Sequence, residues 1–238
     1  MRHWFVIAGC FFCFSTGVFG QALRIATIEL APAGYIENGK VTGIYYDIAN
    51  EIAERANLDY VNALKPYVRT VHELKSGKTD VSIVLYNPVL LGKATPLAPV
   101  FKIETLAIGR KGVNIKSLNE LKGKKVGVIR GSNFVKPELM QGIEIFSVKD
   151  NQQAMRMLHA GRLDAFIGVN IGVYYSMNKF GYARSEFGIP YVANSQSTFL
   201  YVSDKFTDKQ SLKALKAAVE QMSQDGTIQK ITEKYIGQ

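Results

Sequence analysis

A ten-residue pattern occurs twice in this chain, and it constrains the fold more than any other feature. The copies run from Leu74 to Ile83 and from Leu158 to Ile167, and both read Leu-x-x-Gly-basic-x-Asp-x-x-Ile. Each copy is typical of a helix end, a tight turn at glycine and a buried strand. The repeat therefore indicates two similar α/β units rather than one continuous sheet, although a chance match in a common helix–turn–strand unit stays open at this point.

Strand and helix patterns alternate along the rest of the chain. Strands are expected at residues 23–28, 81–85, 106–109, 125–129, 165–169 and 198–202. Helices are expected at residues 46–56, 68–75, 117–121, 152–159, 212–222 and 228–235. This alternation favours an α/β fold built from βαβ units, with largely parallel sheets that are covered on both faces.

The N-terminal segment differs in composition from everything that follows. Arg2 precedes an almost wholly apolar run at residues 4–14, and small residues follow up to Ala22. This order is typical of a secretory signal peptide over residues 1–22, with cleavage after Gly20 or Ala22. The apolar run is shorter than the roughly 20 residues that cross a bilayer, so an uncleaved membrane anchor is the weaker alternative.

Cysteine content and charge exclude several classes of function. Both cysteines, Cys10 and Cys13, lie in this N-terminal segment, so the exported chain offers no disulfide, thiolate metal site or cysteine nucleophile. The formal charge of +9 comes from scattered basic residues without the aromatic stripe of a nucleic-acid surface. The Gly77-Lys78-Thr79 run lacks the earlier glycine of a P-loop. We expect no metal, no cofactor and no nucleic-acid partner.

Five motifs in order resemble the extracellular solute-binding proteins of the polar amino-acid uptake family (family 3). The motifs occupy residues 43–53, 74–80, 117–128, 131–133 and 225–235. The resemblance covers nearly the whole exported chain. It implies the two-lobe periplasmic-binding-protein fold of type II, the Venus-flytrap arrangement, in which two crossing segments act as hinges.

The resemblance also implies how the chain is divided and what it does. Lobe one would comprise residues 23–108 and 201–238, lobe two would comprise residues 109–200, and the crossings would lie near residues 106–110 and 199–203. A protein of this kind is a periplasmic monomer without catalytic activity. It would capture a small polar or anionic solute by hinge closure and deliver it to an ABC permease in the inner membrane.

Candidate ligand-binding residues follow from their positions after the predicted strands or at the opening of the predicted helix 68–75. In α/β sheets ligands bind beyond the carboxyl ends of the strands, and free amides at helix N-termini suit anionic groups. Arginine can grip a carboxylate with two hydrogen bonds, and an aromatic ring can cover a ligand. The candidates in lobe one are Glu29, Tyr35, Tyr67, Arg69, Tyr86 and Asn87. The candidates in lobe two are Arg130, Ser132, Asn133 and Asn170.

Two departures from the family pattern argue against an ordinary α-amino acid as the ligand. Family members carry an arginine for the α-carboxylate two residues after a proline, whereas Val89 and Leu90 follow Pro88 here. They also carry an aspartate for the α-ammonium where this chain has Val169. A buried ammonium without a carboxylate is poorly compensated. Arg69 or Arg130 could instead hold an acid, with Asn170 as a neutral partner.

Two alternatives share the same fold. A periplasmic enzyme of the cyclohexadienyl-dehydratase type would need a carboxylate acid or base, and Glu29 is the only obvious candidate in lobe one. The sequence shows no residue that would pair with Glu29 in catalysis, which argues against that activity. A soluble ligand sensor would use the same binding chemistry and would report to a membrane partner.

Overall fold

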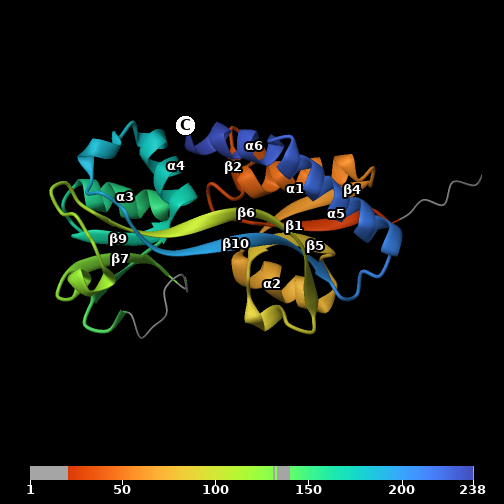
Figure 1. Cartoon of the computed structure of the whole chain (residues 1–238), viewed down its shortest axis with the longest axis horizontal. Coiled ribbons are helices and arrows are strands. Elements are labelled where there is room, and N and C mark those ends of the chain that lie inside the picture. Colours follow the sequence, from red (N-terminus) through yellow and green to blue (C-terminus); the bar gives the residue numbers. More distant parts are fainter. Residues whose placement is uncertain (1–20, 131, 133–139, 238) are drawn as a thin grey trace, which may run out of the picture.

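The computed structural model describes residues 21–130, 132 and 140–237, and it shows two lobes joined by two long strands (Figure 1). The joining strands are β6 (Ala94–Gly109) and β10 (Tyr191–Ser203), which pair with each other antiparallel. They join strands of both lobes into one hydrogen-bonded sheet of order β4-β1-β5-β10-β6-β9-β7-β8. The α/β two-lobe prediction is confirmed, but the expectation of two separate sheets is wrong because β6 and β10 extend through both lobes.

Lobe one combines the first part of the chain with its C-terminal helices. Its strands are β1 (Leu23–Ile28), β4 (Tyr60–Lys65) and β5 (Val81–Leu85), with a separate hairpin of β2 (Tyr35–Glu37) and β3 (Lys40–Thr42). Its helices are α1 (Ile44–Arg55), α2 (Tyr67–Ser76), the 3₁₀ turn η1 (Pro88–Leu90), α5 (Lys209–Gln224) and α6 (Thr227–Ile236). In Figure 1, α1, α5 and α6 cover one face of the sheet and α2 covers the other.

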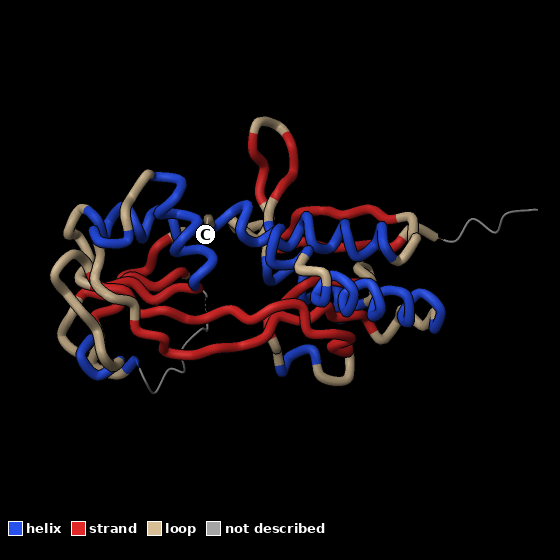
Figure 2. The backbone as a smooth tube through the Cα atoms, turned by 45° about the horizontal axis from the view of Figure 1, so that its top comes forward, coloured by secondary structure: helices blue, strands red, loops and turns tan. Residues whose placement is uncertain are grey.

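Lobe two is formed by the middle of the chain. Its strands are β7 (Lys125–Ile129), β8 (Glu144–Val148) and β9 (Ala165–Val169). Its helices are α3 (Asn151–His159) and α4 (Asn170–Phe180), with short 3₁₀ turns η2 (Leu118–Leu121) and η4 (Arg184–Glu186). Figure 2 shows this lobe on one side of the paired crossing strands and the β2–β3 hairpin standing away from the body of the other.

The strand directions make the two lobes face each other through the carboxyl ends of their strands. The crossing strand β6 runs from lobe one to lobe two, and it is parallel to β5 because both pair antiparallel with β10. The carboxyl end of β5 therefore points toward lobe two. Strand β9 pairs antiparallel with β6, so its carboxyl end, and that of its parallel neighbour β7, point back toward lobe one.

The pairings favour lobe boundaries slightly earlier on each crossing strand than the sequence predicted. Thr105–Gly109 of β6 pair with β9 of lobe two, whereas Thr198–Val202 of β10 pair with β5 of lobe one. We therefore propose that the crossings lie near residues 101–104 and 194–197. The predictions 106–110 and 199–203 came from the family resemblance, and part of each range pairs within a single lobe.

The two copies of the sequence repeat adopt the same local structure. The Asp80 backbone amide donates to the Arg24 carbonyl over 2.8 Å, and its carboxylate accepts from the Arg24 amide over 2.8 Å. In lobe two the Asp164 amide donates to the Lys125 carbonyl over 2.9 Å, and its carboxylate accepts from the Lys125 amide over 3.0 Å. The repeated aspartate thus fixes the first parallel strand of each lobe to the strand after the turn.

The two lobes also contact each other through α4, which lies on the opposite side of the crossing strands from α2 in Figure 1. The Tyr35 and Tyr175 rings are 5.5 Å apart, and Lys179 Nζ lies 3.7 Å from Glu37 Oε1. Asn151, the first residue of α3, donates from Nδ2 to the Ala31 carbonyl over 3.5 Å. These contacts place the β2–β3 hairpin and the loop after β1 against lobe two.

The Lys179–Glu37 ion pair is expected to contribute little to stability. Both side chains are well exposed, and exposed ion pairs contribute about 0–1 kcal/mol because water screens them. Glu37→Gln, which leaves the other contacts of Lys179 in place, should therefore lower the free energy of unfolding by less than about 0.5 kcal/mol in urea titrations. A loss above about 1 kcal/mol would show that this contact holds the lobes together more firmly than its exposure implies.

Candidate ligand-binding site

The start of α2 and the turn after β5 form a hydrogen-bonded unit at the carboxyl ends of the lobe-one strands. Asn87 Nδ2 donates to the Tyr67 hydroxyl over 3.0 Å, and Asn87 Oδ1 accepts from the Val89 amide over 3.0 Å. Burial raises the pKa of the Tyr67 hydroxyl, so it stays protonated near neutral pH. Two of the predicted residues, Tyr67 and Asn87, therefore touch directly and hold each other in place.

Tyr86 lies beside this unit and presents an exposed aromatic ring. Its side chain is on the α2 side of the sheet, because Val84, two residues earlier on β5, packs against Val71 and Leu74 of α2. Tyr86 is 52% exposed, and Val68 of α2 is also exposed. The Tyr67 and Tyr86 rings and the Asn87 amide thus form the lobe-one wall of the candidate site. These groups are suited to covering a small organic molecule.

Arg69 bonds a neighbouring carboxylate through one of its nitrogens. Its Nε donates to Glu73 Oε1 over 2.8 Å, and Lys65 Nζ also donates to the Glu73 carboxylate. These two cations hold the pKa of the Glu73 carboxyl at about 2. The Arg69 side chain remains 69% exposed, so its remaining donors face solvent.

Glu29 and Tyr35 form no hydrogen bond with Tyr67 or Asn87 within the described residues, although Glu29 lies next to the end of β4 that leads into α2. Glu29 is exposed, and its backbone amide donates to the Lys65 carbonyl over 2.8 Å. Tyr35 lies on β2 and packs on Tyr175 of α4, with its pKa raised by burial and by the Tyr175 hydroxyl. Tyr35 therefore contributes to the contact between lobes.

The lobe-two candidates lie after β7 and β9. Arg130 is exposed, and its backbone amide donates to the Val148 carbonyl over 3.0 Å. The Ser132 amide donates to the Ile129 carbonyl over 3.0 Å. Asn133 lies outside the described residues. Asn170 Oδ1 accepts from the Ile171 amide over 2.8 Å and the Glu104 amide over 3.3 Å, which ties the start of α4 to β6.

The described residues carry no grouping of three or more histidine, cysteine or acidic side chains that could hold a metal. Within the same part of the chain, no helix combines the length and the apolar character needed to span a membrane. The predicted signal peptide falls almost entirely in residues 1–20, outside the described ranges.

Comparisons with known proteins match this geometry. No family model matches the chain. The probable amino-acid-binding protein YxeM of Bacillus subtilis (strain 168) is 26% identical over 222 residues, covering 90% of this chain and 83% of YxeM. The L-cystine-binding protein TcyJ of Escherichia coli (strain K12) is 26% identical over 212 residues, covering 84% and 76% of the two chains.

Solved structures extend the match to three dimensions. An ancestral arginine-binding protein bound to arginine superposes with a TM-score of 0.70 at 27% identity, covering 92% of this chain and all of that one. The chain is a two-lobe solute-binding protein. A histidine kinase sensor domain also shares the fold, with a TM-score of 0.74 at 19% identity. The curated relatives are binding proteins, in agreement with the non-enzymatic prediction.

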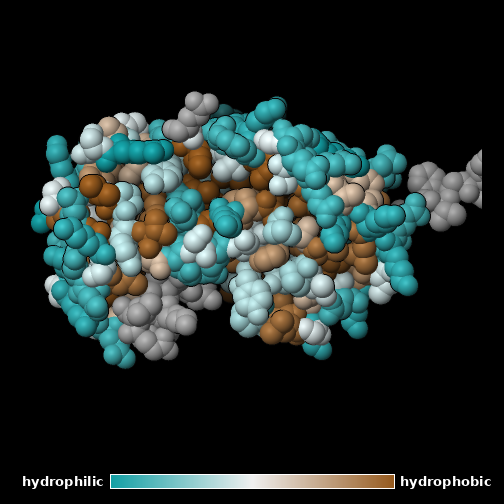
Figure 3. Space-filling view, viewed as in Figure 1, coloured by the Kyte–Doolittle hydropathy of each residue, from teal (hydrophilic) through white to brown (hydrophobic). Residues whose placement is uncertain are grey.

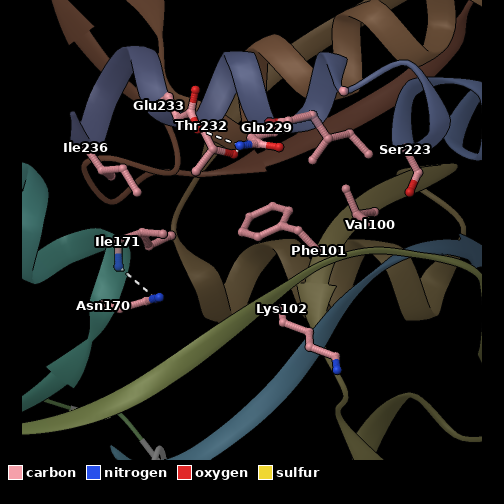
Figure 4. A pocket seen from close by; sticks show the side chains of 12 residues that line it. Val100, Phe101, Lys102, Asn170, Ile171, Ser223, Gln229, Thr232, Glu233 and Ile236 are labelled. Carbon is pink, nitrogen blue, oxygen red and sulfur yellow. Dashed lines mark hydrogen bonds between the residues drawn. The ribbon is translucent and has the colours of Figure 1, made fainter. Parts of the chain in front are cut away.

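This solute-binding protein also has a cavity of about 410 Å³ beside the crossing strands (Figure 4). Phe101 of β6 points into the cavity, and α6 and the start of α4 close it from the other sides. The cavity thus lies on the α6 side of the sheet, opposite to α2. Lys102, the next residue on β6, lies at the edge of the cavity lining, and its side chain runs away from α6 in Figure 4.

Sequence reasoning missed this part of β6 because it placed the strand only from residue 106. Pro96 and Pro99 lie within β6, and proline normally argues against a strand interior. A usable signal was the alternation of Phe101, Lys102, Ile103 and Glu104, which has the period of a half-buried strand.

Proposed function

We propose that this protein captures a small carboxylate-bearing solute, in the first place an amino acid, between its two lobes and delivers it to an ABC permease. The carboxyl ends of the strands of both lobes face each other across the crossing strands, and this arrangement supports the proposal most strongly. Amino acids are the ligand class because the relatives YxeM and TcyJ carry names of amino-acid-binding proteins.

Export and monomeric action belong to the same proposal. The predicted signal peptide over residues 1–22 would direct the chain across the inner membrane, where the periplasmic relatives act. A single chain contains both walls of the site, so closure requires no second copy.

Closure is favourable when the ligand contacts both lobes at once. The indented outline between the lobes, beside α2, is visible in Figure 3. A ligand that contacts the closed form more extensively than the open form shifts the population toward closure. Micromolar affinity corresponds to about 8 kcal/mol, which a few charge-assisted hydrogen bonds and an aromatic contact can supply after ordering costs.

Thermal unfolding of the exported chain (residues 23–238) with a panel of amino acids and their deaminated analogues tests this proposal. A ligand present at 100 times its Kd should stabilise the native state by about 2.7 kcal/mol and raise Tm by several degrees. Asn87→Ala should abolish the rise, because it removes the group that orients Tyr67. Asn119→Ala, an exposed change in lobe two, should keep it. No shift with any compound at millimolar concentration would overturn the proposal.

A further inference from the structure

The crossing strands present a polar face toward the α2 side of the molecule. Tyr201 of β10 packs in the cluster around α2, whereas Leu200 and Val202 pack on the opposite side with α1 and α5. Side chains alternate along a strand. The pairing of β10 with β6 has register shifts between residues 197 and 201, but Phe199 still packs against the same cluster as Tyr201. Ser197 and Ser195 therefore lie on that side too, toward the unit formed by Tyr67 and Asn87.

Two charged residues share that face because they pair with the serines. Lys102 is the register partner of Ser197, and Glu104 is the partner of Ser195. Partners directly across an antiparallel pair point to the same face. Ile103 between them packs with the lobe-one core on the other side, and the Lys102 side chain in Figure 4 runs away from α6 and from Phe101.

The register also brings Lys102 close to the predicted site. Leu85 pairs with Thr198, so Tyr86, the next residue on the chain, lies beside Ser197. Ser197 in turn pairs with Lys102. Adjacent strands are about 4.8 Å apart, so Tyr86 and Lys102 are about 10 Å apart at the backbone. The lysine side chain can therefore reach the space next to the Tyr86 ring.

Neither Lys102 nor Glu104 has an ion-pair partner among the described residues. The side chains of Lys102 and Glu104 have no ion pair within 4.0 Å in the part of the chain that the structure describes. Glu104 is nevertheless fixed through its backbone, because its amide donates to Asn170 Oδ1 over 3.3 Å. Asn170 Oδ1 therefore helps to position Glu104.

We propose that Lys102 and Glu104 bind the two charged ends of a zwitterionic ligand, with Lys102 on its carboxylate and Glu104 on its ammonium. This inference rests on the proposed function and specifies its ligand as an α-amino acid. Residues two apart on a strand are about 6.5–7 Å apart, and their flexible side chains can converge on adjacent opposite charges. The hydroxyls of Ser195 and Ser197 add hydrogen-bonding groups on the same face.

The pair resolves the conflict between the missing family residues and the amino-acid-binding relatives. Val89 and Leu90 follow Pro88, and Val169 ends β9, so the expected arginine and aspartate are absent from those positions. Lys102 and Glu104 instead supply one cation and one anion, both from the crossing strand β6. An ammonium buried by closure would then have a carboxylate partner, as its desolvation requires.

Calorimetric titration of residues 23–238 with the best amino acid from the panel and with two analogues tests the pair. One analogue lacks the carboxylate and the other lacks the ammonium. Lys102→Met should weaken binding of the amino acid at least tenfold but leave the affinity for the amine analogue within about twofold. Glu104→Gln should do the reverse, with a tenfold loss for the amino acid and little change for the deaminated acid.

Control variants separate the pair from general charge effects. Lys116→Met and Glu120→Gln remove exposed charges in lobe two and should leave all three affinities unchanged. If the wild-type chain binds no amino acid, the proposed function itself fails. If the wild-type chain binds and both site variants bind equally well, or both lose all three compounds alike, then Lys102 and Glu104 do not read the two charges and the inference is wrong.

Discussion

Asp80→Ala is expected to lower the free energy of unfolding by about 3 kcal/mol, because the buried carboxylate accepts hydrogen bonds from three Arg24 donors. The donors are the Arg24 backbone amide, Nε and Nη2. Asp80 is only 7% exposed, so water cannot replace the lost acceptor. Truncation would leave the Arg24 backbone amide without its hydrogen-bond acceptor. Arg24 lies on β1, which is between β4 and β5 in the sheet of lobe one.

Asp164→Ala supplies a matched comparison within the same chain. Asp164 occupies the equivalent place in lobe two, but it is 38% exposed, and its contact with Arg110 Nε is long at 3.4 Å. Its loss should cost about 1 kcal/mol, the contribution of one ordinary hydrogen bond. Urea unfolding of both variants at pH 7 measures the difference. Equal losses would show that the repeated aspartate stabilises both lobes only through backbone geometry.

Some elements could be predicted to the residue, and the reason is local. The strands 81–85, 125–129 and 165–169 are short apolar runs bounded by turn signals, and the structure has β5, β7 and β9 at those bounds. The turns before two of them contain glycines at positive φ, Gly77 at 74° and Gly161 at 68°. Such glycines end helices because they adopt the left-handed conformation without a steric penalty.

The elements that the sequence did not predict depend on distant contacts. Helix α4 contains Gly172 and several aromatic residues, which are poor helix formers, and it exists because Val173 and Met177 pack into the lobe-two core. The extension of β6 across both lobes depends on its pairing with β10, about 90 residues away along the chain. Lys102 and Glu104 escaped prediction for this reason, since only the strand register brings them to the site.

The candidate site was predictable by position but not by partner. Tyr86 and Asn87 follow the predicted strand β5, whereas Tyr67 opens the helix after β4, a strand that the sequence did not predict. The structure joins Tyr67 to Asn87 by a hydrogen bond, with Tyr86 next to Asn87 in the chain. Arg69 follows the same rule, yet it bonds Glu73 one helical turn later. A periodic pattern identifies the strand end at which a side chain lies. It does not identify the neighbouring group to which that side chain will bond.

Glu73→Gln is expected to remove on the order of 2 kcal/mol of stability at pH 7 and to flatten the acid dependence of unfolding. Lys65 and Arg69 hold the Glu73 pKa at about 2 in the folded protein, below its ordinary value of 4.5. The folded chain therefore binds this proton later than the unfolded chain as the pH falls. The stabilisation is complete above about pH 4.5 and is lost as the pH decreases toward 2.

Chemical denaturation at pH 7, 4 and 3 checks this expectation. The wild-type advantage over Glu73→Gln should be largest at pH 7 and should shrink at each step, because the wild-type carboxylate approaches the neutral state that the glutamine mimics. Glu220→Gln, an exposed change on α5, should follow the wild type throughout. A constant difference across the three pH values would mean that Glu73 contributes through packing rather than through charge. In that case the Glu73 charge would not be what holds the Arg69 side chain in its present position on α2.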